Sequence, residues 1–172
     1  MSAPPLPSHP PLISALTRGW IAFAAVGAGL IHLALVISAP LFGGILLATV
    51  GVVEFAWGVM VMFDERFLVP RLAVVAVLAP IALWIAALLL DTDSFRPFPL
   101  AIASVLELFI AIAIAVSLRR EGAPKPVSTR RYVVGLAAGA VVAGLLTGPA
   151  LGATEAGQLV SDPTIFDTGV HH

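Results

Sequence analysis

The chain alternates between long apolar segments and short polar connections. The apolar segments cover about 19–37, 41–63, 68–90, 100–118 and 132–151. Each is long enough to cross a hydrocarbon core of about 30 Å as a helix. Inside lipid the backbone must satisfy its own hydrogen bonds, and the sequence lacks the short alternating segments of membrane strands. The pattern therefore predicts an all-α membrane protein, a bundle of five transmembrane helices.

Prolines and polar residues mark the ends of these segments. Pro40 lies in a tight connection between the first two segments, which predicts an antiparallel hairpin, and Pro80 inside the third segment predicts a kink. We expect a disordered Pro-rich lead over 1–15, the transmembrane domain over 16–152 and a flexible tail over 153–172. A cleaved signal peptide is the alternative for the first apolar run, but that run is longer than a usual signal core and another span follows it.

Basic residues are distributed unevenly between the connections. If the N-terminus is inside, the cytoplasmic connections carry all but one of the nine Lys and Arg residues: Arg18, Arg66, Arg71, Arg119, Arg120, Lys125, Arg130 and Arg131. The outer connections and the tail carry only Arg96. Because Lys and Arg in short loops favour the cytoplasmic side, we predict a cytoplasmic N-terminus and an extracytoplasmic C-terminus.

The composition limits which functions and which metal ligands are available to the chain. The chain is 59% hydrophobic and 11% charged, against about 25% charged residues in an average soluble domain. A net charge of −1 gives no basis for nucleic-acid binding. The absence of cysteine excludes thiolate metal sites and covalent c-type haem, so any metal ligands must be His, Glu, Asp or backbone oxygen. Phosphate-loop, nucleophile-elbow and zinc-protease motifs are absent from the sequence, and no nucleophile–base pair is visible, which makes an enzyme the least favoured class.

Three ionisable residues lie within apolar segments: His32 in the first, Glu54 in the second and Glu107 in the fourth. Such residues cost roughly 2.5–3.5 kcal/mol at mid-span and often serve a function. Each has small residues three or four positions away, so we expect all three to face the bundle interior. At a rise of about 1.5 Å per residue, His32 and Glu107 lie roughly 9 and 12 Å below the outer ends of their spans, and Glu54 roughly 20 Å. If the first and fourth spans are neighbours, the three can line one polar track.

The sequence leaves several interpretations of these residues open. His32, Glu54 and Glu107 can form a proton or ligand site, or His32 and Glu107 can bind a divalent transition metal such as copper or zinc. The alternative is structural, with protonated carboxyl groups and the imidazole hydrogen-bonding across helices. His171 and His172 in the tail form a second candidate metal site, and a tail without a role is the alternative there.

Small residues recur at helical spacing in the spans. The second segment carries Gly44, Gly51 and Gly58 seven apart, and the fifth carries Gly135 and Gly139 four apart. Such faces let helices approach closely in lipid, within one chain, in a homo-oligomer or in a larger membrane complex. A non-catalytic accessory or assembly subunit of such a complex is therefore the alternative to a metal or proton site.

Parts of the sequence resemble a known group of proteins. Residues 27–34 read GAGLIHLA, residues 41–44 read LFGG, residues 54–57 read EFAW, and the tail begins ATEAG at 153–157. The combination resembles a group of small multipass membrane proteins of actinobacteria, whose tails often end rich in histidine. This tail is poor in histidine, which departs from the group. The resemblance implies a bacterial inner-membrane protein and transfers no activity.

Overall fold

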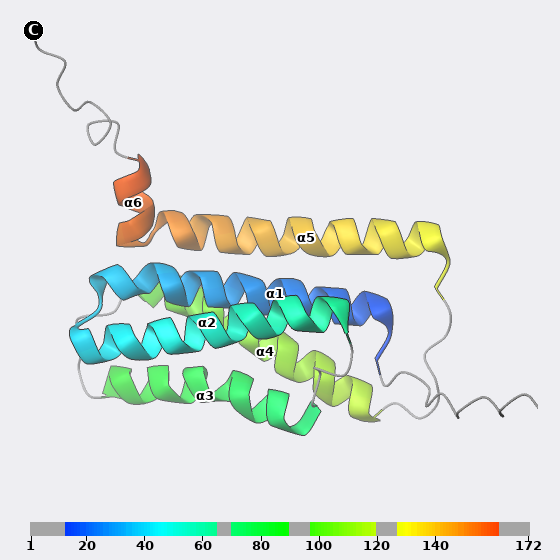
Figure 1. The fold of residues 1–172 in the computed structure, drawn as a ribbon, viewed down its shortest axis with the longest axis horizontal. Helices are drawn as coiled ribbons and strands as arrows, with labels where there is room; N and C mark the ends of the chain where they lie inside the picture. Colours follow the sequence, from blue (N-terminus) through cyan, green and yellow to red (C-terminus); the bar gives the residue numbers. More distant parts are fainter. Residues whose placement is uncertain (1–12, 65–69, 90–96, 120–126, 162–172) are drawn as a thin grey trace, which may run out of the picture.

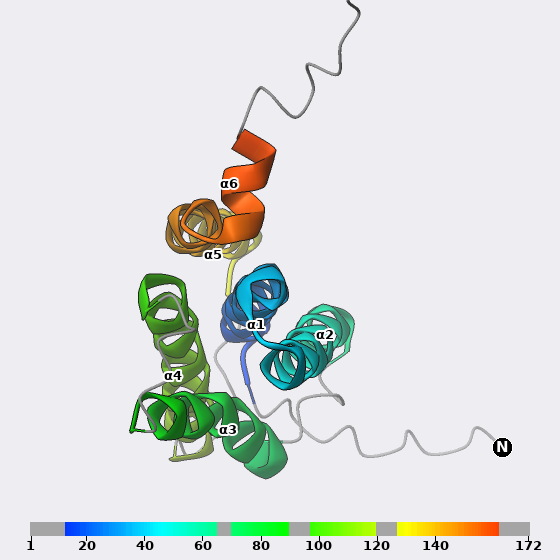
Figure 2. The same cartoon turned by 90° about the vertical axis from the view of Figure 1, so that its left-hand side faces the viewer.

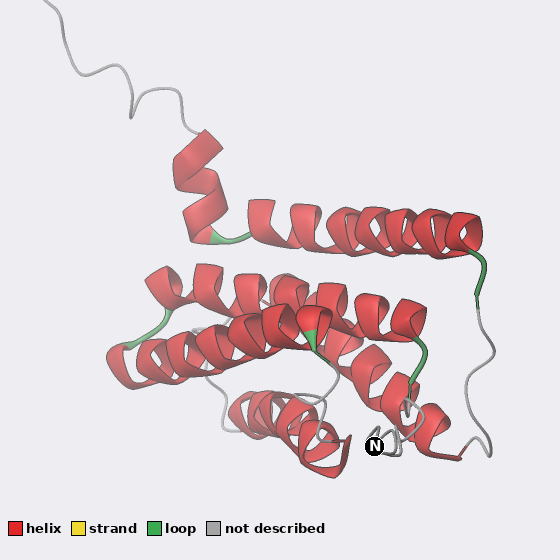
Figure 3. Ribbon diagram, turned by 45° about the vertical axis from the view of Figure 1, so that its right-hand side comes forward, coloured by secondary structure: helices red, strands yellow, loops and turns green. Residues whose placement is uncertain are grey.

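The computed structural model describes residues 13–64, 70–89, 97–119 and 127–161, and within these ranges the regular structure is entirely helical (Figures 1 and 3). The elements in chain order are α1 (Ala15–Leu35), the 3-10 turn η1 (Val36–Ser38), α2 (Leu41–Phe63), α3 (Pro70–Leu89), α4 (Pro97–Arg119), α5 (Thr129–Gly152) and α6 (Glu155–Ser161). The prediction of an all-α protein is therefore confirmed for the described residues.

Four stretches are long and apolar enough to cross a membrane, and a fifth is shorter. The four are Ala15–Ser38, Leu41–Phe63, Pro97–Arg119 and Thr129–Gly152, and α3 contributes the apolar stretch Leu72–Ala86. Many large apolar side chains lie on the outside of the bundle, with Phe42 86% and Leu145 70% exposed. A surface of this kind suits lipid rather than water as the solvent. The chain is thus a multipass membrane protein by length and composition, and five spans with an internal N-terminus stay a prediction.

Helix α1 is the centre of the bundle. Seen end-on, it lies between α2, α4 and α5 (Figure 2), and it contacts all three. Its small residues Ala25 and Ala28 and the larger Ile21 and Ile31 are buried in the core. Helix α3 packs against α4 and makes few contacts with α2.

Glycines bring α1 and α2 into close contact along the expected hairpin. A Cβ atom on Gly51 would lie 2.8 Å from the Gly29 carbonyl oxygen, and one on Gly29 would lie 2.7 Å from the Gly51 carbonyl oxygen. Because the obstructing atoms belong to the backbone, no rotamer change can make room. The small residues at these two positions therefore set the distance between the helices.

The glycines of α5 fall into two groups. Gly135 and Gly139 pack against Leu16 and Trp20 of α1, and the Trp20 indole Nε1 donates a hydrogen bond of 2.9 Å to the Gly135 carbonyl oxygen. Further along the same helix, Gly144 has no atom within 4 Å of the position that a Cβ would take. The first part of the predicted small-residue face is therefore used for packing inside this chain.

Local capping explains where the observed helix ends differ from the expected ones. Helix α1 starts before residue 19 because the Ser14 hydroxyl accepts a hydrogen bond of 3.1 Å from the Thr17 amide. In the tail, buried Thr154 accepts a hydrogen bond of 3.1 Å from the Gly157 amide, which caps the start of α6. The tail that we expected to be flexible from residue 153 therefore begins with a short helix.

Candidate functional site

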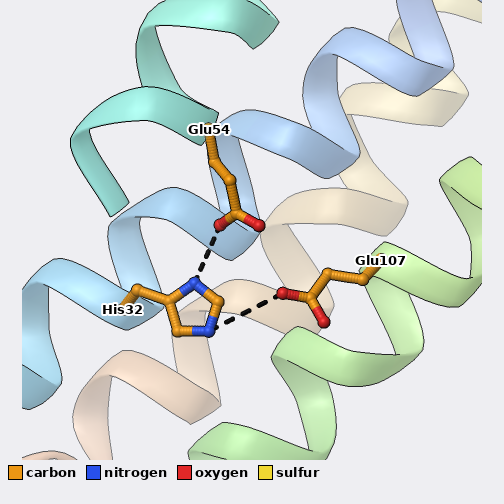
Figure 4. Close-up of side chains that lie close together, drawn as sticks. All are labelled: His32, Glu54 and Glu107. Atoms are coloured by element: carbon orange, nitrogen blue, oxygen red, sulfur yellow. Dashed lines mark hydrogen bonds and ion pairs between the residues drawn. The ribbon is translucent and has the colours of Figure 1, made fainter. Parts of the chain in front are cut away.

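The structure brings the three intramembrane ionisable residues together around the imidazole of His32. His32 Nδ1 lies 2.8 Å from Glu54 Oε2, and His32 Nε2 lies 3.7 Å from Glu107 Oε1 (Figure 4). One ligand atom from each residue can be chosen such that all three lie within 4.8 Å of one another. Helices α1, α2 and α4 thus each contribute one side chain to a single cluster.

The relative depths of the three side chains differ from those predicted by counting residues along each span. That count placed Glu54 well below His32, whereas its carboxylate is hydrogen-bonded to the imidazole. Side chains on a helix lean toward its N-terminus, and α1 and α2 run in opposite directions. The two side chains therefore lean toward each other. The close contact of Gly29 with Gly51, one turn before each residue, brings the helices near enough for them to meet.

The cluster is almost completely shielded from solvent. The side chains of His32, Glu54 and Glu107 are 4%, 11% and 1% exposed, respectively. Isolated charges are very costly at such burial, so the cluster as a whole must be close to neutral. Two ionised carboxylates and a neutral imidazole carry a charge of −2, which either one divalent cation or two protons would cancel.

Two carboxylate oxygens of the cluster have unfilled hydrogen-bonding capacity. Among the described residues, neither Glu54 Oε1 nor Glu107 Oε1 has a hydrogen-bond partner. Buried acceptors without partners are uncommon because each costs roughly 1–3 kcal/mol. The two oxygens are therefore able to accept a hydrogen bond or to bind a cation.

The gap between His32 and Glu107 matches the size of a metal ion. A separation of 3.7 Å is too long for a hydrogen bond. Two ligands each about 2.1 Å from a tetrahedral ion lie roughly 3.4 Å apart. On the opposite side of the ring, Glu54 accepts a hydrogen bond from Nδ1 when that nitrogen carries the proton, which leaves the Nε2 lone pair directed toward Glu107. A carboxylate that orients a histidine in this way is a recurrent feature of metal sites.

The other candidate residues are not part of this cluster. His171 and His172 lie outside the described residues. The sequence analysis missed Thr147, which is buried against Gly27 of α1 and whose Oγ1 has no hydrogen-bond partner within the described part of the chain. The available signal was that Thr147 carries the one hydroxyl in the apolar stretch 133–152 of α5. Its surroundings indicate a packing role between α5 and α1.

Fold and site together define the class: a multipass α-helical membrane protein that holds, among its described residues, a buried cluster of a histidine and two glutamates. No protein-family model, curated protein or solved structure matches the chain. The similarity to small actinobacterial membrane proteins stays a prediction.

Proposed function

We propose that this protein is a five-span membrane protein that binds one divalent transition-metal ion between α1, α2 and α4. His32 and Glu107 supply ligands, and Glu54 orients the imidazole or adds a third ligand. The observation that carries the proposal is the convergence of one imidazole and two carboxylates within 4.8 Å in a shielded interior. Zinc and copper suit a ligand set of one nitrogen and carboxylate oxygens.

Charge balance supports the metal. A divalent cation, two carboxylates and a neutral imidazole sum to zero, which removes the cost of holding charge within the membrane. The ion would also fill the unpartnered carboxylate oxygens. Because such an ion binds the folded chain and cross-links three helices, it should stabilise the bundle by an amount that rises with the logarithm of its affinity.

The expected topology supports access from outside the cell. With a cytoplasmic N-terminus, α1 ends and α2 begins on the outer side, and His32 lies three residues before the end of α1. The apolar stretch of α3 would supply the fifth span. A location in a bacterial inner membrane follows from the resemblance of the first two spans to the actinobacterial group.

Proton transfer is a second candidate function, and it is supported by the position of the His32 imidazole between the two carboxyl groups. The imidazole presents one nitrogen to each carboxylate, so a proton accepted at one nitrogen can be balanced by release from the other. In this account two bound protons replace the ion. The two candidates use the same residues and differ in whether purified protein takes up metal.

The metal content of tag-free protein purified in detergent distinguishes metal binding from proton transfer. After incubation with zinc, copper or iron and removal of free ions, mass spectrometry should find about one ion per chain. His32→Ala and the isosteric Glu107→Gln should abolish this uptake. Glu155→Gln on α6, outside the cluster, is the matched control and should retain it. Circular dichroism confirms that each variant is folded.

The alternatives predict different results. Loss of metal only on deletion of residues 162–172 would assign capture to His171 and His172 in the tail. If folded wild-type protein takes up none of the three metals, the metal proposal fails and proton transfer becomes the leading account.

A further inference from the structure

An apolar cleft runs between α2 and α3 and reaches the His–Glu cluster. It consists of two adjoining cavities of about 510 and 130 Å³, which share walls formed by Leu46, Val50, Pro80 and Leu83. Glu54 lines the larger cavity and His32 lines the smaller one. The cleft exists because α3 packs against α4 instead of α2.

The wall of the cleft on α3 consists largely of small residues. Ala73, Ala76 and Ala79 line the larger cavity beside Pro80, and none of them is long enough to reach across to α2. The larger cavity has its mouth at the surface, since its lining side chains Val53 and Leu72 are 60% and 66% exposed. In a bilayer this mouth would face lipid. A ligand would therefore enter from the hydrocarbon phase and not from water.

Polar side chains in the cleft are few, and two of them, Glu54 and His32, belong to the cluster. The lining also contains Thr49, whose hydroxyl donates a hydrogen bond of 2.8 Å to the Ile45 carbonyl oxygen. Trp57 lines the larger cavity and Trp84 the smaller one. An apolar enclosure of this size, with a few polar groups at one place, is typical of a site for a small lipophilic molecule.

From this geometry we propose that the cleft binds a neutral, lipid-soluble molecule whose hydroxyl or carbonyl oxygen forms a hydrogen bond with the carboxyl group of Glu54, whose Oε1 has no partner among the described residues. Long-chain quinones and isoprenoid alcohols share this chemistry. The apolar part of the ligand lies against the alanine face of α3, and its oxygen head reaches the cluster. The inference goes beyond metal binding and does not require it, because either an ion or two protons leave the cluster neutral.

Charged head groups fit this cleft poorly. Phosphate and fatty-acid carboxylate heads would lose their hydration on entering an apolar cleft, and a neutral cluster offers no net positive charge in return. A cationic head would lose its hydration without gaining a net opposite charge from a neutral cluster. A neutral oxygen head gains hydrogen bonds without either cost.

Ligand binding can be measured with the full-length protein in phosphatidylcholine nanodiscs, both stripped with EDTA and loaded with zinc. Decylubiquinone is the first probe, because quinones quench tryptophan fluorescence and Trp57 and Trp84 line the cleft. Farnesol is added as a competitor with a hydroxyl head, and palmitate as an anionic competitor. We expect saturable quenching that farnesol reverses and palmitate does not.

Two pairs of variants place the binding in the cleft. Ala76→Phe narrows the larger cavity from α3 and Val53→Phe narrows it from α2, whereas Ala82 and Val52 are exposed and do not line it. The first two substitutions should each weaken binding about tenfold or more, and Ala82→Phe and Val52→Phe should leave it unchanged. Having one variant on each wall keeps the test valid if one of them misfolds.

The results also distinguish quinones from isoprenoid alcohols as ligands, and they test the cleft independently of metal binding. Binding of the quinone without competition by farnesol supports the site and restricts it to carbonyl heads. Equal effects of the lining and control variants, competition by palmitate as strong as that by farnesol, or no saturable binding in either stripped or loaded protein would overturn the proposal. Binding to stripped protein shows the cleft to be functional even if the metal proposal fails.

Discussion

Replacement of Gly51 by alanine should push α1 and α2 apart and loosen the cluster. The new Cβ would lie 2.8 Å from the Gly29 carbonyl oxygen, 2.8 Å from Leu33 Cγ and 3.0 Å from the Leu33 amide nitrogen. Ordinary contacts of a Cβ atom begin at 3.4 Å, so the helices must separate by roughly 0.6 Å. The obstructing Gly29 oxygen and Leu33 nitrogen belong to the backbone, which leaves few cheaper ways to relieve the overlap.

The consequence for stability and for the site can be estimated from this displacement. Overpacking of this kind costs about 1–3 kcal/mol of unfolding free energy. A shift of roughly 0.6 Å would stretch the hydrogen bond between His32 and Glu54 from 2.8 Å to beyond the usual limit of about 3.2 Å. Loss of a group that orients a metal-binding histidine typically lowers metal affinity by about 10–100-fold. We therefore expect Gly51→Ala to lower the affinity for zinc by a factor of about 10–100.

The assay compares Gly51→Ala with Gly144→Ala in the same detergent. A Cβ on Gly144 would have no atom within 4 Å, so this control should leave both stability and zinc affinity close to wild type. Zinc affinity is measured by isothermal titration calorimetry, and stability by unfolding in mixed micelles. If both variants behave alike, helix spacing at Gly51 does not determine the geometry of the cluster and the reasoning fails.

Three further predictions concern packing, capping and topology. Trp20→Phe removes the hydrogen bond to Gly135 and should cost about 1 kcal/mol in unfolding without changing metal content, and an unchanged unfolding curve would contradict it. Thr154→Ala removes the cap of α6 and should cost about 1 kcal/mol locally, seen as faster amide exchange in that helix alone. Because the chain has no cysteine, single Ser128→Cys and Ser161→Cys variants report topology in intact cells. An impermeant maleimide should label residue 161 and not residue 128, and the reverse pattern would invert the orientation.

The sequence predicts the positions of the spans well because lipid imposes a length and a composition on each helix. The second span was predicted over 41–63, and α2 covers Leu41–Phe63. The first was predicted to start at 19, and the helix starts at Ala15, because Ser14 caps it among residues that are less apolar. Helix α6 was not predicted. It begins after Thr154, which caps it, and the burial of Thr154 depends on tertiary packing, which a hydropathy pattern cannot reveal.

The candidate cluster was predicted in part. Small residues near His32, Glu54 and Glu107 indicated that each faces other helices, and the structure places all three in one cluster. Their meeting depends on α1 lying between α2 and α4, which is a matter of helix order around the bundle. Counting residues along each span also ignored the opposite lean of side chains on antiparallel helices. Hydropathy alone could not reveal the cleft, because it arises where α2 and α3, close in sequence, pack on other partners.

The central position of α1 has a consequence for biogenesis. Synthesis proceeds from the N-terminus, so the helix that ends up in the middle of the bundle enters the membrane first, before the partners that will surround it. His32 is then carried in lipid until α2 supplies Glu54, and the cluster is complete only when α4 delivers Glu107. Binding at this cluster would therefore be restricted to chains that have inserted α4, which makes it a marker that α1, α2 and α4 have come together.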